Sequence, residues 1–314
     1  MERILMIGCS GQIGTELTLE LRKIYGDGNV FATDIKEAPL EVRETGPFEI
    51  LDVLDENRLN HFAIRHKITQ VYNLAAVLSS NAEKIPLKAW DINMRALMNT
   101  LELARSIRLK KLFWPSSIAV FGPTTSKTDT PQLTVMEPNT VYGISKLAGE
   151  RWGEYYHKRY GVDFRSVRYP GLISYKTEPG GGTTDYAVEI YYEAIQNGKY
   201  ECFLKEDTGL PMMFMPDAIK ATINYMEADA SKLSLRSSYN VGGMSFTPKD
   251  VAEAIRKHIP DFEITYKPDF RQAIANSWPA SINDDVARRD WNLSYEYNLD
   301  SMTEVMLREI RAKI

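Results

Sequence analysis

Apolar residues in the first half of the chain form two kinds of pattern, which follow one another in turn. Short continuous apolar runs predict buried strands at residues 3–7, 30–33, 48–53, 70–76, 111–117 and 164–169. Stretches with apolar positions every three or four residues predict helices at residues 12–25, 55–66, 87–107 and 141–160. Strands that alternate with helices in this way favour an α/β fold with a doubly wound parallel sheet.

The pattern changes after residue 170. Residues 178–186 contain three adjacent glycines, which fit either a hinge against a ligand or a plain surface loop. The remaining predicted elements are a strand at 238–241 that adds to the main sheet, and helices at residues 186–197, 216–227, 246–259 and 299–314. A smaller carboxy-terminal lobe therefore follows the regular strand–helix part.

A glycine-rich turn joins the first predicted strand to the first predicted helix. Its sequence is Gly8-Cys9-Ser10-Gly11-Gln12-Ile13-Gly14, and the next strand ends in Asp34. In such a turn, glycines let backbone N–H groups approach a pyrophosphate at the helix N-terminus. A carboxylate 20 residues after Gly14 can bind both ribose hydroxyls and repels a 2′-phosphate, which favours NAD over NADP. The other interpretation of Asp34 is an ordinary turn acid at a strand end.

Other strand ends predict ligand contacts at the same edge of the sheet, because the carboxyl ends of parallel strands meet there. Asp52 and Val53 end the third predicted strand and either reach an adenine or cap the next helix. Small residues after Leu74 would let a cofactor lie against the backbone. Ser79 is expected in the loop that follows, and Pro170 stops the sixth strand.

Tyr142 and Lys146 are four residues apart on a predicted helix, so their side chains share one face. A neighbouring ammonium group lowers the pKa of a phenol and lets it exchange a proton with an alcohol. Alone, this spacing often arises by chance on a solvated helix. Ser117, at the end of the fifth strand, adds a hydroxyl that can stabilise the substrate oxygen. The three residues together predict an alcohol–ketone site with NAD as the hydride acceptor.

Composition narrows the class of protein further. The chain has 314 residues, 44% hydrophobic and 25% charged, which is enough for one large or two joined domains. Its net charge of -4 does not favour nucleic-acid binding, and no apolar run has membrane-spanning length. Cys9 and Cys202 are expected to be buried free thiols, as in a cytoplasmic protein. The four histidines lack metal-ligand spacing, so no metal is predicted.

Motifs along the whole chain resemble those of one superfamily. They are Gly8-x-x-Gly11-x-x-Gly14, Asp34, Asp52-Val53, Asn73-Leu74-Ala75-Ala76, Asn93, Ser116-Ser117, Tyr142-x-x-x-Lys146 and Arg168-Tyr169-Pro170-Gly171. In this order they resemble the extended short-chain dehydrogenase/reductase superfamily. Four later segments, residues 114–122, 179–186, 211–218 and 277–291, are most similar to the short-chain L-threonine 3-dehydrogenases, which are similar in fold to UDP-galactose epimerases. Asn292-Leu293 departs from the glycine-tryptophan expected after Trp291.

The resemblance implies a Rossmann fold and NAD-dependent, metal-independent oxidation of L-threonine at its β-hydroxyl to 2-amino-3-oxobutanoate. Tyr142 would be the general base, Ser117 would polarise the substrate oxygen, and Lys146 would hold the nicotinamide ribose and lower the Tyr142 pKa. The implied cofactor-binding residues are Gly8, Ser10, Gly11, Gln12, Ile13, Gly14, Asp34, Asp52, Val53, Leu74, Ala75, Ala76, Asn93, Tyr142, Lys146, Tyr169, Pro170 and Leu172. The implied substrate-binding residues are Ser79, Ser117, Tyr142, Gly182, Thr183, Thr184 and Trp278, the last expected to be exposed or half-buried.

The expected domain division fits the same resemblance. Residues 1–169 with 217–241 would form the NAD-binding domain, and residues 170–216 with 242–314 the substrate lobe. The helices at 87–107 and 141–160 carry apolar positions beyond one stripe, which favours a homodimer, as the resemblance also implies.

Two other functions are compatible with these motifs. A sugar-nucleotide epimerase or dehydratase would use the same catalytic residues, although residues 170–216 contain few basic groups for a diphosphate. A non-catalytic NAD-sensing module would keep the fold but would have no use for a tuned tyrosine.

Overall fold

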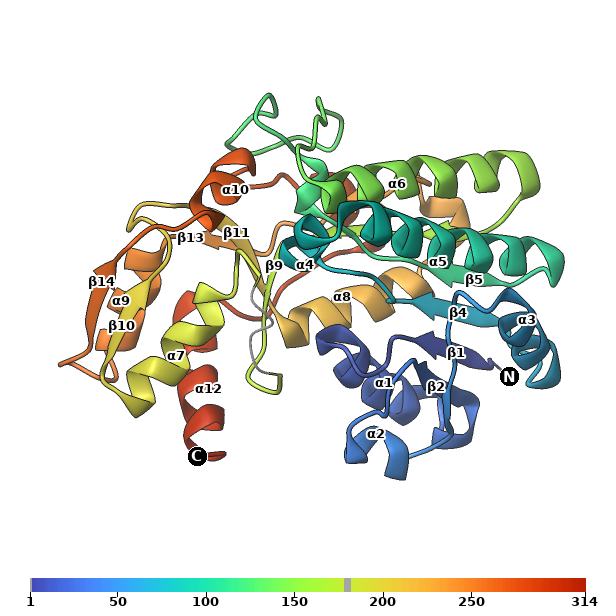
Figure 1. Ribbon diagram of the computed structural model, residues 1–314, viewed down its shortest axis with the longest axis horizontal. Coiled ribbons are helices and arrows are strands. Elements are labelled where there is room, and N and C mark those ends of the chain that lie inside the picture. Colours follow the sequence, from blue (N-terminus) through green and yellow to red (C-terminus); the bar gives the residue numbers. More distant parts are fainter. Residues whose placement is uncertain (1, 178–181) are drawn as a thin grey trace.

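The computed structural model describes residues 2–177 and 182–314 and is shown in Figure 1. The strands are β1 (Ile4–Ile7), β2 (Val30–Asp34), β3 (Phe48–Ile50), β4 (Gln70–Asn73), β5 (Lys111–Phe113), β6 (Ser116–Ser117), β7 (Phe164–Arg165), β8 (Val167–Tyr169), β9 (Gly171–Ile173), β10 (Lys199–Cys202), β11 (Leu210–Phe214), β12 (Tyr239–Asn240), β13 (Met244–Phe246) and β14 (Glu263–Tyr266).

The helices alternate with these strands in the first half of the chain. The α-helices are α1 (Gln12–Tyr25), α2 (Leu40–Glu44), α3 (Glu56–Arg65), α4 (Ser79–Lys84), α5 (Pro86–Ser106), α6 (Val141–Tyr160), α7 (Tyr186–Gln196), α8 (Met215–Glu227), α9 (Pro248–Arg256), α10 (Arg271–Ser277), α11 (Asp285–Trp291) and α12 (Leu299–Arg311). Short 3₁₀ turns lie at Asp27–Asn29, Ile118–Val120 and Ala230–Lys232.

A six-stranded sheet forms the centre, in the order β3-β2-β1-β4-β5-β7, and all its neighbouring strands are parallel. The residues of β1 are buried on both faces, as expected when helices cover both sides. Ile4 and Met6 belong to a core cluster with Leu17 of α1. Leu5 and Ile7 belong to a second cluster with residues of α3, α5 and α6. The predicted doubly wound parallel sheet is therefore confirmed, with α5 and α6 on one face and α1 and α8 on the other (Figure 1).

Helix α6 lies unusually close to the sheet. Its N-cap is Thr140, whose hydroxyl accepts a hydrogen bond from the Gly143 N–H at 3.1 Å. A Cβ at Gly149 would lie 2.3 Å from the Trp114 ring, and one at Gly153 would lie 2.1 Å from the Phe164 ring. Because both positions are glycine, the helix backbone can pack directly against these rings.

Several predicted strands are shorter than expected. Residues 111–117 form β5 and β6 with Trp114-Pro115 between them, because proline has no N–H to donate to a sheet. Residues 164–169 are likewise divided into β7 and β8. The strands β6, β8 and β12 form a separate three-stranded sheet, so the strand predicted at 238–241 does not join the six-stranded one. The third strand ends at Ile50, before a turn closed by the Asp52 carboxylate and the Leu54 N–H.

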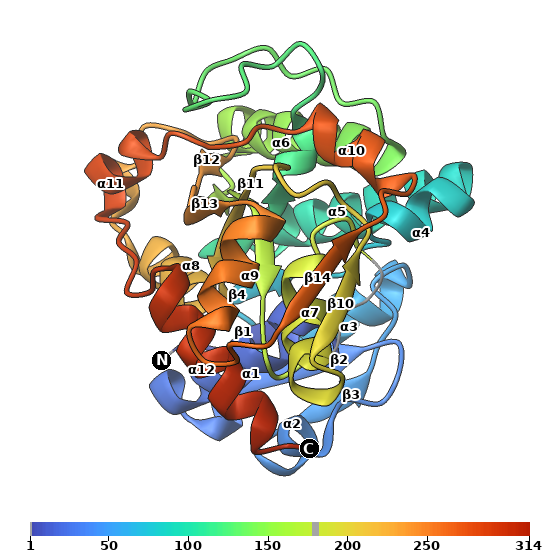
Figure 2. The same ribbon diagram turned by 90° about the vertical axis from the view of Figure 1, so that its left-hand side faces the viewer.

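The carboxy-terminal lobe has its own core, built by α7, α9 and α12 around β11 (Figure 2). Strand β11 pairs with β9 in parallel and with β13 antiparallel, and β10 pairs with β14. Cys9 and Cys202 are buried free thiols, as predicted. In the part of the chain that the structure describes, no helix has the length and apolar character needed to cross a membrane.

Candidate active site

Tyr142 lies on the first turn of α6, opposite Ser117 at the end of β6. The Ser117 hydroxyl hydrogen-bonds the Tyr142 phenol, and it also accepts the Ala119 N–H at 3.2 Å. Burial raises the pKa of Tyr142 to about 12, and the hydrogen bond from Ser117 opposes this effect. The structure thus brings together a phenol and a hydroxyl that can share one substrate oxygen.

Lys146 lies one turn further along α6 and is buried. Its ammonium donates to the Pro115 carbonyl at 2.6 Å and lies 4.1 Å from the centre of the Trp114 ring. Burial lowers the pKa of Lys146 to about 7, although the Glu150 carboxylate works against this change. The prediction that Lys146 lowers the pKa of Tyr142 is wrong for this arrangement. Burial raises that pKa, and the Lys146 ammonium is directed to the Pro115 carbonyl.

The glycine turn after β1 leaves room for a ligand at the start of α1. Gly8 has a φ of 84°, and a Cβ there would lie 3.1 Å from the Ala75 backbone nitrogen. A Cβ at Gly14 would lie 2.1 Å from the Gly8 carbonyl oxygen. The first turn of α1 has no acidic residue, and Gly11 at its N-cap provides no side-chain hydrogen bond. The free N–H groups and the positive end of the helix dipole therefore fit a pyrophosphate.

Asp34 lies beside this turn, at the end of β2. Its carboxylate accepts the Ser10 N–H at 2.9 Å, which fixes its orientation next to the glycines. Asp52 is exposed and closes its local turn, whereas Val53 is buried. Asn93, which is buried in α5, accepts from the Val77 N–H at 2.7 Å and donates to the Val77 carbonyl at 3.1 Å, so it holds the chain after β4 in place.

Two residues predicted to bind substrate carry buried polar atoms without a hydrogen-bond partner in the described part of the chain. They are the Thr183 hydroxyl and the Trp278 indole N–H. Trp278 was expected to be exposed or half-buried, but only 7% of it is exposed because it packs in the carboxy-terminal core. Gly182 donates its N–H to Asp185 at 2.7 Å, while Gly180 and Gly181 lie outside the described residues.

The other predicted site residues lie around these groups. Ser79 and Ser80 are not in a loop but begin α4. Tyr169, Pro170 and Leu172 lie where β8 leads into β9, and the Tyr169 hydroxyl is hydrogen-bonded to Thr222 of α8.

A cavity of about 720 Å³ lies elsewhere, between α1, α2 and α8, and no predicted site residue is part of its lining. Among the residues that the structure describes, no three His, Cys, Asp or Glu side chains are grouped so as to hold a metal ion.

Two residues next to the site were missed at the level of sequence. Glu150 lies one turn after Lys146, and its spacing of four residues from Lys146 could have revealed it. Lys127 donates to the carbonyls of Ser277 at 2.8 Å and Trp278 at 3.3 Å, and so ties the loop before α6 to the segment that carries Trp278. No sequence pattern indicates that long-range contact.

Comparison with known proteins gives consistent matches. The model of the NAD dependent epimerase/dehydratase family matches residues 4–242. An uncharacterized epimerase/dehydratase of Staphylococcus saprophyticus is 51% identical, over 100% of this chain and 98% of that protein. The structure of a partial consensus L-threonine 3-dehydrogenase is 58% identical with a TM-score of 0.96, and 99% of each chain is covered. A holo GalE-like L-threonine dehydrogenase from Cupriavidus necator is 56% identical with a TM-score of 0.96, over 98% of this chain and 99% of that chain.

Proposed function

This chain belongs to the NAD dependent epimerase/dehydratase family, and on that premise we propose that it oxidises L-threonine at its β-hydroxyl to 2-amino-3-oxobutanoate, with NAD and without a metal. The observation that carries the proposal is the similarity over nearly the full length to solved L-threonine 3-dehydrogenases, at 58% and 56% identity. Those proteins match the substrate lobe as well as the nucleotide-binding half. The proposal therefore extends to the substrate and not only to the cofactor.

NAD is the cofactor, and the residues around the glycine turn fit it. The start of α1 offers unpaired N–H groups to the pyrophosphate, and the close contact between Gly8 and Gly14 excludes side chains that would block it. Asp34 is held by Ser10 where it would accept hydrogen bonds from the adenosine ribose. The residues expected to surround the rest of the cofactor are Asp52, Val53, Leu74, Ala75, Ala76, Asn93, Tyr169, Pro170 and Leu172.

The chemistry follows from the three catalytic candidates. When bound, NAD supplies the acceptor for the hydride that leaves the β-carbon. Tyr142 takes the proton from the β-hydroxyl, and Ser117 hydrogen-bonds the same oxygen as the carbonyl forms. Lys146 holds the nicotinamide ribose. The products are the ketone, the reduced cofactor and a proton that Tyr142 passes to solvent.

The substrate would lie between α6 and the carboxy-terminal lobe. Thr183 and Trp278 carry polar atoms that have no partner among the described residues, which supports a role in binding the amino-acid part of threonine. Ser79, Gly182 and Thr184 complete the proposed pocket. The proposed domain division is residues 1–169 with 217–241 for NAD, and residues 170–216 with 242–314 for substrate.

The first test is the absorbance of NADH after the protein is mixed with NAD and L-threonine in the presence of a chelator. We expect a steady rise with L-threonine and none with D-threonine. If NADH does not form although NAD binds, L-threonine is not the substrate.

A sugar-nucleotide epimerase or dehydratase is the alternative that the family description favours. The charges of the substrate lobe argue against it. Arg271, Arg288 and Arg289 are each paired with an acid, at 2.7 Å, 2.6 Å and 2.9 Å respectively. Arginines that already face an acid offer less uncompensated positive charge to a diphosphate. Incubation with UDP-sugars tests this alternative, because an epimerase would convert them without net formation of NADH.

A homodimer is the proposed assembly. Helices α5 and α6 lie side by side on one face of the sheet (Figure 1). Large exposed apolar side chains gather on these two helices: Leu87, Trp90, Ile144, Trp152, Tyr155 and Tyr160. Pairing of these two helices with their copies would bury this surface.

A further inference from the structure

Helix α6 contacts Pro115 and the two residues of β6 at three positions in successive turns. Tyr142 hydrogen-bonds Ser117, and Lys146 donates to the Pro115 carbonyl at 2.6 Å. Glu150 accepts a hydrogen bond from the Ser116 hydroxyl at 2.7 Å. These three helix residues are spaced by four, so they lie on one face of α6. Two of them are the proposed catalytic residues, and the third has no assigned role.

Glu150 is anchored by a buried ion pair. Its two carboxylate oxygens accept from the Arg168 Nε at 2.9 Å and Nη2 at 2.8 Å. Glu150 is 0% exposed and Arg168 is 2% exposed, so both charges are removed from water. A two-point arginine–carboxylate pair of this kind fixes orientation as well as distance.

The ion pair is connected to the sheet on both sides. Ser116 and Asn240 are the neighbours of Arg168 in the parallel pairings of β8 with β6 and β12. Arg168 also donates to the Asn240 side-chain oxygen at 3.0 Å and to the Gln132 carbonyl at 3.2 Å. The position of Glu150, and with it of α6, is thus set by three strands and by the loop that precedes the helix.

We propose that Glu150 is a positioning residue for the oxidation proposed above. Because Arg168 anchors it, Glu150 fixes the position of α6 relative to residues 115–117. It also supplies the negative charge that Lys146 faces. This inference rests on the proposed function for its kinetic consequences, but not for its effect on cofactor binding. The charged or titratable groups around the Lys146 ammonium are Tyr142, Glu150 and, behind Glu150, Arg168. Glu150 is the one among them that raises the pKa of Lys146.

Three variants separate charge from geometry. Glu150→Gln with Arg168→Met removes both buried charges together, so no unpaired ion is left behind. Glu150→Asp keeps the negative charge but shortens the side chain by one carbon. Glu154→Gln is the matched control, because Glu154 lies one turn further on the same helix and binds Arg151 and Lys158 at the surface.

The first measurement is NADH affinity against pH, followed by cofactor fluorescence. An ammonium binds ribose oxygens more tightly than a neutral amine, so affinity should fall as Lys146 loses its proton. In the double variant, Glu150→Gln with Arg168→Met, we expect the pH at which half of the affinity change has occurred, the midpoint, to be lower by about one unit. The reason is that the Glu150 charge, which raises the pKa of Lys146, is gone. Glu150→Asp and Glu154→Gln should keep the native midpoint.

The second measurement is kcat for NADH formation from L-threonine. We expect Glu150→Asp to lose about tenfold in kcat, because the catalytic groups shift with the helix. If the double variant melts like the native protein and matches Glu154→Gln in both midpoint and kcat, Glu150 has no positioning role. If the double variant does not fold, a Glu150→Asp protein with native kcat would also overturn the proposal. If native protein fails to oxidise L-threonine, the proposed function falls while the NADH titration still decides the role of Glu150.

Discussion

At the scale of single residues, burial pushes Tyr142 and Lys146 toward their neutral forms. The pKa of Tyr142 is raised to about 12 and that of Lys146 is lowered to about 7. The base form of Tyr142 is therefore scarce at neutral pH and has to be stabilised by hydrogen bonds. Ser117 supplies one, whereas the Lys146 ammonium is directed to the Pro115 carbonyl.

Tyr142→Phe tests the role of the phenol directly. We expect kcat for L-threonine oxidation to fall by at least about a hundredfold, because general base catalysis contributes about 10²- to 10⁴-fold. NAD binding should survive, since the ring still packs in place. The measurement is steady-state NADH formation together with NADH fluorescence on binding. Retained turnover would remove the proton-transfer role from Tyr142.

Asp34→Ala tests the selection of the cofactor. Asp34 is oriented by the Ser10 N–H at the end of β2, where its charge would repel a 2′-phosphate. The ratio of kcat/KM for NAD to that for NADP should fall by about tenfold or more in the variant. Asp55→Ala is the control, because Asp55 is exposed, caps α3 and is not among the proposed cofactor contacts. An unchanged ratio in Asp34→Ala would place the ribose elsewhere.

At the scale of elements, the helices around the site were the most predictable part. The bounds of α1 and α6 agree with the prediction, because each helix ends at a glycine, Gly26 and Gly161, that the sequence displays. Strands were predicted less well, since the separation of β6 and β8 from the six-stranded sheet depends on pairing between residues far apart in sequence. The helix at Ser79 and the burial of Trp278 also depend on tertiary packing, which a local pattern does not contain.

The same limit applies to the candidate site. Tyr142, Lys146 and the glycine turn have fixed spacings that sequence alone displays. Arg168 follows 18 positions after Glu150, and Lys127 meets Trp278 across 151 positions. Only the folded chain brings these pairs together.

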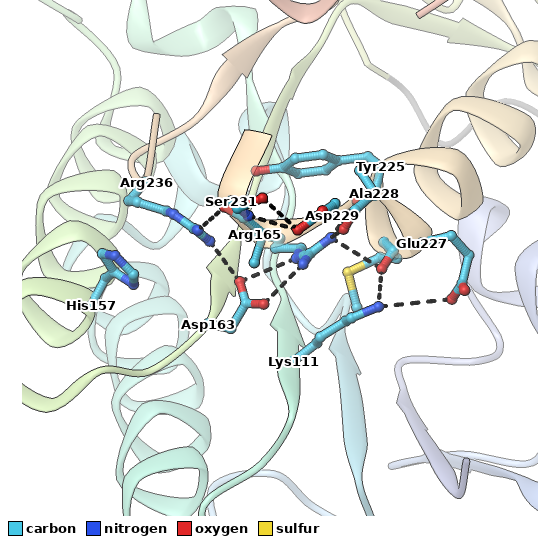
Figure 3. A network of polar contacts seen from close by, with 12 residues as sticks. Lys111, His157, Asp163, Arg165, Tyr225, Glu227, Ala228, Asp229, Ser231 and Arg236 are labelled. Atoms are coloured by element: carbon cyan, nitrogen blue, oxygen red, sulfur yellow. Dashed lines mark hydrogen bonds and ion pairs between the residues drawn. The ribbon is translucent and has the colours of Figure 1, made fainter. Parts of the chain in front are cut away.

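One further contact between elements involves Arg165 of β7 and the end of α8 (Figure 3). Arg165 is buried and pairs with Asp163 at 2.9 Å. It also donates to the carbonyls of Tyr225 at 2.6 Å and Ala228 at 2.8 Å. A cation at the last carbonyls of a helix is favourable because of the helix dipole. Arg165 therefore holds α8 against the sheet.

Arg165→Met should lower the free energy of unfolding by about 3 kcal/mol, because Asp163 and the α8 carbonyls lose a buried partner. Arg236→Met is the matched control. Arg236 also binds Asp163, at 2.8 Å, but is less buried, so its loss should cost about 1 kcal/mol. Urea unfolding measures both values. Equal losses in the two variants would contradict the special role of Arg165.

At the scale of the whole molecule, the exposed aromatic residues of α5 and α6 are the feature that remains to be explained. Trp152 is 41% exposed and Tyr155 is 48% exposed, and their rings contact each other edge to face. With Trp90 and Tyr160 they are four large exposed aromatic side chains on two neighbouring helices, whereas single exposed apolar residues elsewhere need no explanation. A second copy is the proposed cover.

If the proposed dimer forms, Trp152→Glu should convert it into monomers at micromolar concentration, because a charge would be buried in the proposed contact. Light scattering after size-exclusion chromatography measures the mass. Phe270→Glu is the control, since Phe270 is 66% exposed but lies outside α5 and α6. A native protein that is monomeric at every concentration tested would contradict the proposed assembly.

The position of the Arg165 network has a consequence for directed evolution. The network also includes Lys111, which begins β5 and pairs with Glu227 of α8 at 3.9 Å, and Asp163 precedes β7 (Figure 3). Ser117, by contrast, lies beyond the carboxyl end of β5. Libraries that vary the lobe around Thr183 and Trp278 would therefore leave this source of stability untouched. Mutations that strengthen the network could be introduced first. The stability they add would offset the destabilisation that usually accompanies mutations for a new substrate specificity.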